Sequence, residues 1–556
     1  MLQLISLEVT NFRAIKHALL NFDQITLLIG ENDLAKSTLM EVLSATMNPK
    51  LDDKLPEFNS FHFYKDPDKE VPEKRLEIKL LLQLQNHTGL NEFKELELLS
   101  VKSEEELIKE PKFEVSFNSS LSGSYTTAEW SCTNLQKGVV TKDPRVLKVL
   151  RRIIPVIHLR FGILTGFLNI VVPDEDDARL EIDLEDRLKQ QIFASVNEIL
   201  LGTTQDTNAS VNKGFHAVEE LMEYYGQPNQ ELKQEDGLVV RIREILQMVS
   251  LTEKENIVEA LKRFQRLTEK LATLMLVHAL LRSGPQKFEK NSRPLLIFEH
   301  PEAFLHTTTL ATISILLGRI RWQKIITTNS GLLLSRVPLK SIRRLRRKKG
   351  LIQVNSIDSQ YYTNEDLRRL SYHLRAKYSM ASFDRFWILV EGESEYWILP
   401  HLARIMNYEF LQEGISVIDF AQSGLTPLLK YATDLGIGWH VLVDGDEAGQ
   451  RYEDLVKNFT NKYELKNPVT RLEQKDIEHL FWYNGFKKEY IKAAQRLNVP
   501  ENENKPGLTI RRAIKNKSKP FLALSIIETI ASKGPAAIPD KLFQMIEACI
   551  EQARRN

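Results

Sequence analysis

Residues 24–38 read Gln24-Ile-Thr-Leu-Leu-Ile-Gly-Glu-Asn-Asp-Leu-Ala-Lys-Ser-Thr38, and this stretch decides the fold class. The apolar run that ends at Ile29 predicts a short buried strand. A polar loop that opens with Gly30 follows, and the apolar residues from Leu39 to Leu43 begin a helix. The order strand, loop, helix is the repeating unit of an α/β fold, so we expect a largely parallel sheet.

The loop matches the phosphate-binding pattern Gly-x-x-x-x-Gly-Lys-Ser/Thr, except that Ala35 replaces the second glycine. Backbone N–H groups at a helix N-terminus attract phosphate oxygens, Lys36 would reach the β and γ phosphates, and Ser37 would hold Mg²⁺. The predicted ATP-binding residues are Gly30, Asn32, Ala35, Lys36, Ser37 and Thr38. The alternative is an ordinary strand-to-helix turn that carries Lys-Ser-Thr by chance.

A second part of a nucleotide site is predicted at the end of a later strand. The apolar run Leu295 to Phe298 is followed directly by Glu299, where a carboxylate would bind Mg²⁺ together with Ser37. A surface turn that begins with Glu is the alternative. His300 and His306 do not have the spacing of zinc ligands, so we predict no zinc site here.

Carboxylates also follow two strands in the C-terminal part of the chain. Glu391 comes directly after the apolar run that ends at Val390, and Asp444 and Asp446 come directly after Val443. Parallel strands bring their carboxyl ends to one edge of a sheet, so these acids are expected to converge and to need Mg²⁺ or Mn²⁺. Such a site suits phosphodiester hydrolysis, and Glu478 is a further candidate ligand. An acidic turn without metal is the alternative for the second group.

Two basic runs stand out, at 343–349 and at 511–519. Each run is either a solvated face or a contact for nucleic-acid phosphates. No aromatic residue is interleaved with the basic residues, so stacking of single-stranded bases is not predicted.

Composition limits the class of protein. A chain of 556 residues suggests about three to four domains. Its 75 basic and 74 acidic residues give a net charge of +1, which excludes a uniformly basic coat. Two cysteines exclude a disulfide scaffold and a Cys-x-x-Cys metal site. Apolar runs are too short to span a bilayer, so we expect a cytoplasmic protein without a membrane partner.

Together these motifs resemble the OLD (overcoming lysogenisation defect) family of ATP-dependent endonucleases, most closely its YbjD-like branch. The segments that carry the resemblance are Leu7-Glu-Val-Thr-Asn-Phe-Arg13, the phosphate loop, Glu299-His-Pro-Glu-Ala-Phe-Leu-His306, Thr327-Thr-Asn-Ser330, Trp387-Ile-Leu-Val-Glu-Gly-Glu-Ser-Glu395, Phe420-Ala-Gln-Ser-Gly-Leu425, Asp444-Gly-Asp-Glu-Ala-Gly449 and Ser518-Lys-Pro520. The resemblance implies an α/β fold with an ABC-type P-loop ATPase head over 1–375, which contains a helical insertion at about 180–285. It further implies a Toprim α/β domain over 383–480 and a helical C-terminal segment over 481–556.

The resemblance also implies residue roles. The catalytic residues would be Glu391, Glu395, Asp444, Asp446, Glu478 and Lys519. All but Lys519 would be metal ligands for two-metal cleavage of DNA, and Lys519 would stabilise charge on the transferring phosphate. The family further implies a homodimer.

The departures from the family pattern lie in the ATPase half. His300 occupies the usual position of a glutamate that polarises water, Asn329 replaces a typical histidine, and no Leu-Ser-Gly-Gly-like signature precedes Leu295. The resemblance therefore implies a DNA endonuclease whose degenerate head binds ATP for dimerisation or regulation. The alternative is an ATP-responsive DNA clamp that does not cleave.

Overall fold

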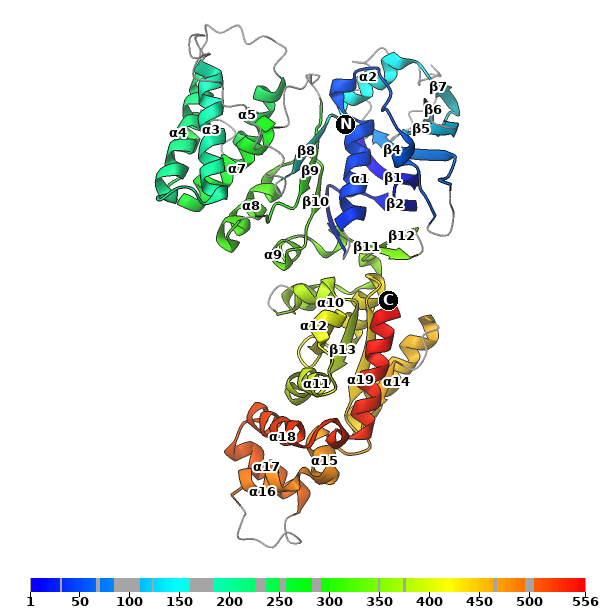
Figure 1. Cartoon of the computed structure of the whole chain (residues 1–556), viewed down its shortest axis with the longest axis vertical. Helices are drawn as coiled ribbons and strands as arrows, with labels where there is room; N and C mark the ends of the chain where they lie inside the picture. The colour runs from blue at the N-terminus through cyan, green and yellow to red at the C-terminus, as the bar shows by residue number, and fades with distance from the viewer. Residues whose placement is uncertain are drawn as a thin grey trace. The chain divides into compact units, whose positions relative to one another are not determined.

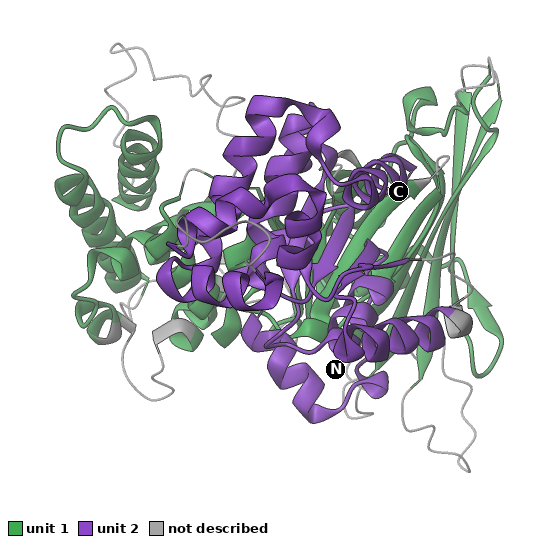
Figure 2. Cartoon of the chain, turned by 90° about the horizontal axis from the view of Figure 1, so that it is seen from below, with its two compact units in different colours: residues 1–355 green, residues 356–556 purple. Residues whose placement is uncertain are grey.

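The computed structural model describes the chain in segments. These are residues 2–30, 33–66, 71–84, 111–122, 125–160, 184–225, 237–250, 257–282, 292–303, 305–348, 351–373, 377–463, 468–495 and 505–555. The chain divides into two compact units, Met1–Asn355 and Ser356–Asn556, which are coloured separately in Figure 2. The predicted domain bounds stay a prediction.

The first unit is built on a mixed sheet whose described strands run in the order β7-β6-β5-β4-β1-β2-β12-β11-β3-β10-β9-β8. The strands are β1 (Leu2–Phe12), β2 (Ile15–Asn21), β3 (Ile25–Ile29), β4 (Arg75–Leu84), β5 (Lys112–Ser122), β6 (Tyr125–Asn134), β7 (Val139–Thr141), β8 (Val156–Arg160), β9 (Leu295–Glu299), β10 (Lys324–Thr327), β11 (Ile342–Lys348) and β12 (Leu351–Ser356). Strands β11, β3, β10, β9 and β8 are parallel, whereas β1, β2 and β4 to β7 pair antiparallel.

Sequence patterns account for this division of the sheet. Every residue of β9 is buried, as in a parallel strand covered on both faces, whereas β4 alternates between buried and more exposed residues. The helices of this unit are α1 (Asp33–Thr46), α2 (Pro144–Ile153), α3 (Leu184–Leu201), α4 (Thr207–Tyr224), α5 (Gly237–Ser250), α6 (Ile257–Lys262), α7 (Leu267–Arg282), α8 (Thr307–Arg319) and α9 (Gly331–Leu334). Helices α3, α4 and α7 pack together as a separate layer of the unit, which Figure 1 shows in green.

The predicted strand, loop and helix of the phosphate loop are β3, Gly30 and α1. Gly30 has a φ of +154°, and a Cβ added there would lie 2.6 Å from the backbone oxygen of Leu345, so this position requires glycine. Ala35 lies in the first turn of α1, where φ is negative, so its methyl group causes no backbone strain.

The second unit contains four described parallel strands in the order β14-β13-β15-β16. They are β13 (Phe386–Val390), β14 (Ile415–Asp419), β15 (Gly438–Val443) and β16 (Val469–Arg471). The helices are α10 (Asn364–His373), α11 (Glu393–Ile405), α12 (Phe410–Glu413), α13 (Leu425–Asp434), α14 (Glu447–Tyr463), α15 (Ile477–Phe481), α16 (Lys487–Ala493), α17 (Pro506–Asn516), α18 (Lys519–Lys533) and α19 (Asp540–Arg555).

The C-terminal helices share one hydrophobic core with this sheet. Phe386 and Ile388 of β13 belong to the same buried cluster as Ile526 of α18 and Ile546 of α19. Helix α18 also packs directly against α11 (Figure 1). Residues far apart in the sequence are thereby brought to the carboxyl end of the sheet.

Candidate active site

The carboxyl edge of the second unit holds the predicted acidic residues. Strands β13 and β15 are parallel, with Val390 opposite Leu442, so Glu391 and Asp444 follow neighbouring strands at the same edge. The backbone N–H of Asp444 donates a hydrogen bond to the Glu391 carboxylate. The expectation that these two acids converge is therefore confirmed by the strand register.

Three further predicted residues reach this edge from helices. Glu395, in the first turn of α11, is only 5% exposed, and Glu478 of α15 is equally buried. Glu478 Oε1 lies 3.4 Å from Lys519 Nζ, the first residue of α18. Ser394 Oγ donates to the same Glu478 oxygen at 2.8 Å, a contact that the sequence did not indicate.

Negative charge accumulates at this edge, and the pKa values of its acids report this. Burial, followed by the charges of Glu395 and Glu391, raises the pKa of Asp444 to about 8. Burial also raises the pKa of Glu395 to about 7, with a smaller contribution from Glu478. The pKa of Glu391 is raised by burial and by Asp446. Lys519 offsets only part of this charge.

The residues at this edge fit a divalent cation. Glu391 Oε2 is buried and has no hydrogen-bond partner among the described residues. Hard carboxylate oxygens with a deficit of positive charge are what Mg²⁺ or Mn²⁺ would satisfy. Within the described part of the chain, no three His, Cys, Asp or Glu side chains already stand in an arrangement that could hold a metal ion. Binding would therefore require side-chain movements that bring these carboxylates together.

Asp446 has a second role that the sequence did not indicate. Its Oδ1 accepts hydrogen bonds from the backbone N–H groups of Ala448 at 2.9 Å and Gly449 at 3.0 Å, at the start of α14. A Cβ added to Gly449 would lie 1.8 Å from the backbone oxygen of Asp444, and one added to Gly445 would lie 2.2 Å from that of Gln474. Both glycines are thus required for close approach of the backbone around Asp444.

The first unit brings the phosphate-loop lysine into a buried polar chain. Lys36 is 0% exposed, and its Nζ donates to the Gly30 carbonyl at 2.5 Å and to Asn329 Oδ1 at 3.1 Å. The backbone N–H of Asn329 donates to Glu302 Oε1 at 2.8 Å. Of the other predicted nucleotide-binding residues, Thr38 is buried in α1, and Asn32 lies outside the described residues.

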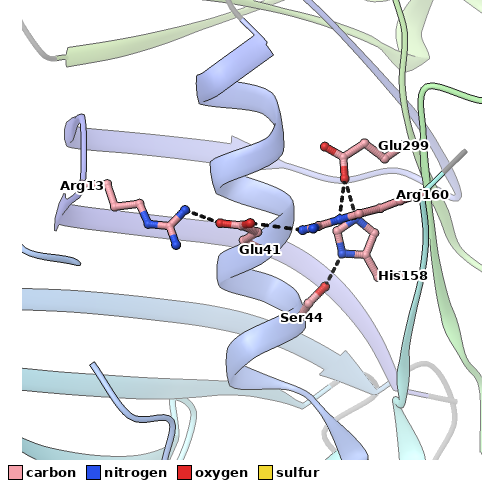
Figure 3. Close-up of polar contacts among 6 residues, drawn as sticks. All are labelled: Arg13, Glu41, Ser44, His158, Arg160 and Glu299. Atoms are coloured by element: carbon pink, nitrogen blue, oxygen red, sulfur yellow. Dashed lines mark hydrogen bonds and ion pairs between the residues drawn. The ribbon is translucent and has the colours of Figure 1, made fainter. Parts of the chain in front are cut away.

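Glu299 lies at the end of β9 as predicted, and it is held by a histidine and an arginine that the sequence did not indicate (Figure 3). His158 Nε2 lies 2.8 Å from Glu299 Oε2, and Arg160 Nε lies 3.0 Å from the same oxygen. Burial raises the pKa of Glu299, but hydrogen bonds from His158 and Ser37 and the charge of Arg160 outweigh it and lower the pKa to about 2. Ser37 and Glu299, the two predicted head ligands, are therefore in contact.

This network extends across α1 to the first hairpin. Arg160 also contacts Glu41 Oε1 at 3.2 Å, and Arg13 pairs with the other oxygen of Glu41. Ser44 Oγ lies 2.7 Å from His158 Nδ1. Figure 3 shows the six side chains as one connected group that links β8, β9, α1 and the turn after β1.

His300, at the position where ABC-type heads carry a glutamate, has a φ of +51°. Its Nδ1 lies 3.4 Å from Glu302 Oε1. Such backbone conformations of non-glycine residues are uncommon and occur often at functional sites.

The reading of the first basic run as a solvated or phosphate-binding face is wrong for its first two arginines. Residues 343–348 of the run lie on β11, where Arg343 and Arg344 are 8% and 2% exposed, and Lys349 lies outside the described residues. Arg343 is anchored by Asp23 Oδ2 at 2.8 Å and by the backbone oxygen of Asn21 at 3.1 Å. In the second run, Arg511, Arg512 and Lys515 are exposed.

Across the described helices, none combines the length and the apolar character needed to cross a bilayer.

Solved structures give distant matches. The C-terminal region of the Burkholderia pseudomallei OLD protein is 17% identical, and the match covers 31% of this chain and 99% of that chain with a TM-score of 0.26. The SMC head domain from Thermotoga maritima is 10% identical, and the match covers 64% of this chain and 99% of that chain with a TM-score of 0.31.

Sequence comparisons place the chain in a family. A family model described as a protein of unknown function (DUF2813) matches residues 2–381, and one described as an overcoming lysogenization defect protein-like TOPRIM domain matches residues 383–446. The uncharacterized protein YbjD of Escherichia coli (strain K12) is 30% identical over 569 residues, which cover 98% of each chain. The chain therefore belongs to the DUF2813 family of YbjD-like proteins, and an OLD-like Toprim domain follows its α/β head in the sequence.

Proposed function

We propose that the protein is an Mg²⁺- or Mn²⁺-dependent DNA endonuclease that hydrolyses phosphodiester bonds at the carboxyl edge of the second unit. One observation carries the proposal: buried acids with raised pKa values share this edge with Lys519, and one Glu391 oxygen is left without a partner among the described residues. The match of residues 383–446 to the OLD-like Toprim model supports it, because that segment includes Glu391, Asp444 and Asp446.

The residues of this edge would divide the chemistry among them. Glu391, Glu395, Asp444, Asp446 and Glu478 would hold two metal ions, which activate water and stabilise the leaving oxygen. Lys519 is held beside Glu478, and its ammonium group would stabilise the charge that develops on the transferring phosphate. Ser394 donates a hydrogen bond to Glu478 and so orients the Glu478 carboxylate beside Lys519.

The head would bind ATP at the phosphate loop, and a homodimer would form through it. Burial of the Lys36 amine beside Gly30 and Asn329 supports a site prepared for phosphate, because that amine would exchange these oxygens for phosphate oxygens. With His300 in the place of the usual glutamate, we propose that ATP regulates the protein rather than driving rapid turnover.

A cleavage assay on supercoiled plasmid tests the proposal. We expect nicked and linear products in Mg²⁺ or Mn²⁺ and none in EDTA. The variant Lys36→Ala is expected to keep metal-dependent cleavage but to lose any change caused by ATP, since Lys36 lies in the other unit. Plasmid that stays intact with every metal, although the protein still binds it, would replace the nuclease with a DNA clamp.

Arg160 is expected to set the metal dependence of nucleotide binding. Because Arg160 neutralises Glu299, the wild type should bind ATP with little dependence on Mg²⁺. In Arg160→Ala, Glu299 would lose its arginine partner and repel phosphate more strongly, and affinity in EDTA should fall about tenfold, or about 1.4 kcal/mol. Affinity in Mg²⁺ should change less than about threefold, because the cation replaces the lost charge.

Titration of a fluorescent ATP analogue in EDTA and in Mg²⁺ measures both affinities. Arg145→Ala is the control, because Arg145 is an exposed arginine of the same unit that pairs with Asp143. Equal losses for Arg160→Ala in EDTA and in Mg²⁺ would contradict the expectation.

A further inference from the structure

The corner between α17 and α18 is basic and contributes no acidic residue of its own. Between Glu503 and Glu528 the sequence contains no Asp or Glu. It contains six basic residues there, which are Lys505, Arg511, Arg512, Lys515, Lys517 and Lys519. Residues 515–519 are all exposed, and they connect the end of α17 to the start of α18. This charge is therefore available to a polyanion.

The corner leads directly to the acidic edge. Lys519 is its last basic residue, and its Nζ lies 3.4 Å from Glu478 Oε1 among the proposed metal ligands. An anionic strand that followed the lysines would thus arrive beside the carboxylates, with Lys519 at the junction. The basic corner and the acidic edge therefore adjoin each other at Lys519.

An exposed aromatic ring stands beside these lysines. Phe521 is 51% exposed, and Lys517 Nζ lies 5.0 Å from the centre of its ring. The start of α18 holds Phe521 in place, because Ser518 caps the helix by accepting a hydrogen bond from the Phe521 N–H at 3.4 Å. The next two residues, Leu522 and Ala523, are buried, so the helix directs the Phe521 ring outward.

We propose that this corner, residues 515–521, binds an unpaired DNA strand and guides it to the acidic edge. A base would stack on Phe521, and the adjacent phosphates would contact Lys515 and Lys517. A duplex hides the faces of its bases, whereas an unpaired strand offers them, and an aromatic ring beside a cation is how proteins hold such strands. The sequence did not indicate this, because the only ring of the corner comes two residues after its last lysine.

This inference rests on the proposed nuclease function for the fate of the strand, but binding tests it independently of cleavage. Fluorescence anisotropy of the full-length chain in EDTA would compare one labelled oligonucleotide as a single strand and as a duplex. We expect the single strand to bind more tightly. Phe521→Ala should weaken single-strand binding about tenfold and duplex binding less than about twofold, and Phe521→Trp should retain single-strand affinity.

Matched variants distinguish the contribution of the lysine charges to DNA binding from that of the aromatic ring. Lys517→Ala should weaken both DNA forms and reduce the slope of log affinity against log salt by about 1. Lys541→Ala is the charge control, because Lys541 is an exposed lysine at the start of α19, outside the corner. Leu411→Ala, on α12 at the amino end of β14, is the control for losing an exposed apolar side chain. Neither control should change binding more than about twofold.

A Phe521→Ala protein that melts like the wild type but binds the single strand within twofold of it would overturn the proposal. So would an equal loss for both DNA forms. If the plasmid stays intact while Phe521→Ala selectively loses affinity for the single strand, single-strand binding at the corner is supported and the proposed nuclease function is overturned. If the plasmid is cut while the wild type binds both DNA forms equally, the proposed nuclease function is supported and single-strand binding at the corner is overturned.

Discussion

Asp444→Asn is expected to lower metal-dependent cleavage by about a thousandfold while the protein stays folded. Asp444 follows β15 directly, at the centre of the acidic edge, where Glu395, Glu391, Asp476 and Glu478 all act on its charge. The amide keeps the shape of the side chain but removes the negative charge that would bind the cation. It also relieves repulsion, so the fold should not be weakened.

Initial rates on supercoiled plasmid in Mg²⁺ and Mn²⁺, with melting curves for each protein, provide the measurement. Asp454→Asn is the matched control, because Asp454 is an exposed carboxylate on the neighbouring α14. It should cleave within about twofold of the wild type. Cleavage by Asp444→Asn at a rate near the wild type would remove Asp444, and with it the proposed two-metal site, from the mechanism.

Strand ends are what the sequence predicts well. Glu299 and Glu391 lie at strand ends as predicted, because each follows a continuous apolar run, and such a run is a buried parallel strand. Once the strands are parallel, the acids that follow them must share an edge. The pairing of Glu391 with Asp444 therefore needed no knowledge of the side-chain packing.

Contacts between distant segments are what the sequence could not supply. His158 and Glu299 are 141 residues apart, and nothing in the local pattern around His158 indicates its partner. The same holds for Ser394 and Glu478, which are 84 residues apart. The prediction of a surface position is wrong for Arg343, because a run of basic residues is typical of a surface, whereas here Asp23 compensates a buried guanidinium.

The stability of the metal-free protein is expected to fall as pH rises from about 5 to 8. The ordinary pKa values of Asp444 and Glu395 are 3.8 and 4.5, and the fold raises them to about 8 and about 7. The folded state therefore binds more protons than the unfolded state within this range. Stability is fully present below the ordinary values and is lost as pH rises through the raised ones, at up to about 1.4 kcal/mol per pH unit for each group.

Melting curves in EDTA and in Mn²⁺ at pH 5 to 8 measure this coupling. In EDTA, the Tm of the second unit should fall steadily over this range, by about 2–4 °C for each kcal/mol of stability lost in a domain of this size. Mn²⁺ should restore most of the loss at pH 8, because a cation at the edge takes over the role of the protons. Asp444→Asn should flatten the profile and weaken the response to Mn²⁺. A Tm that rises with pH in EDTA, or a wild type and Asp444→Asn with the same profile, would contradict the crowding of charge on which the metal site depends.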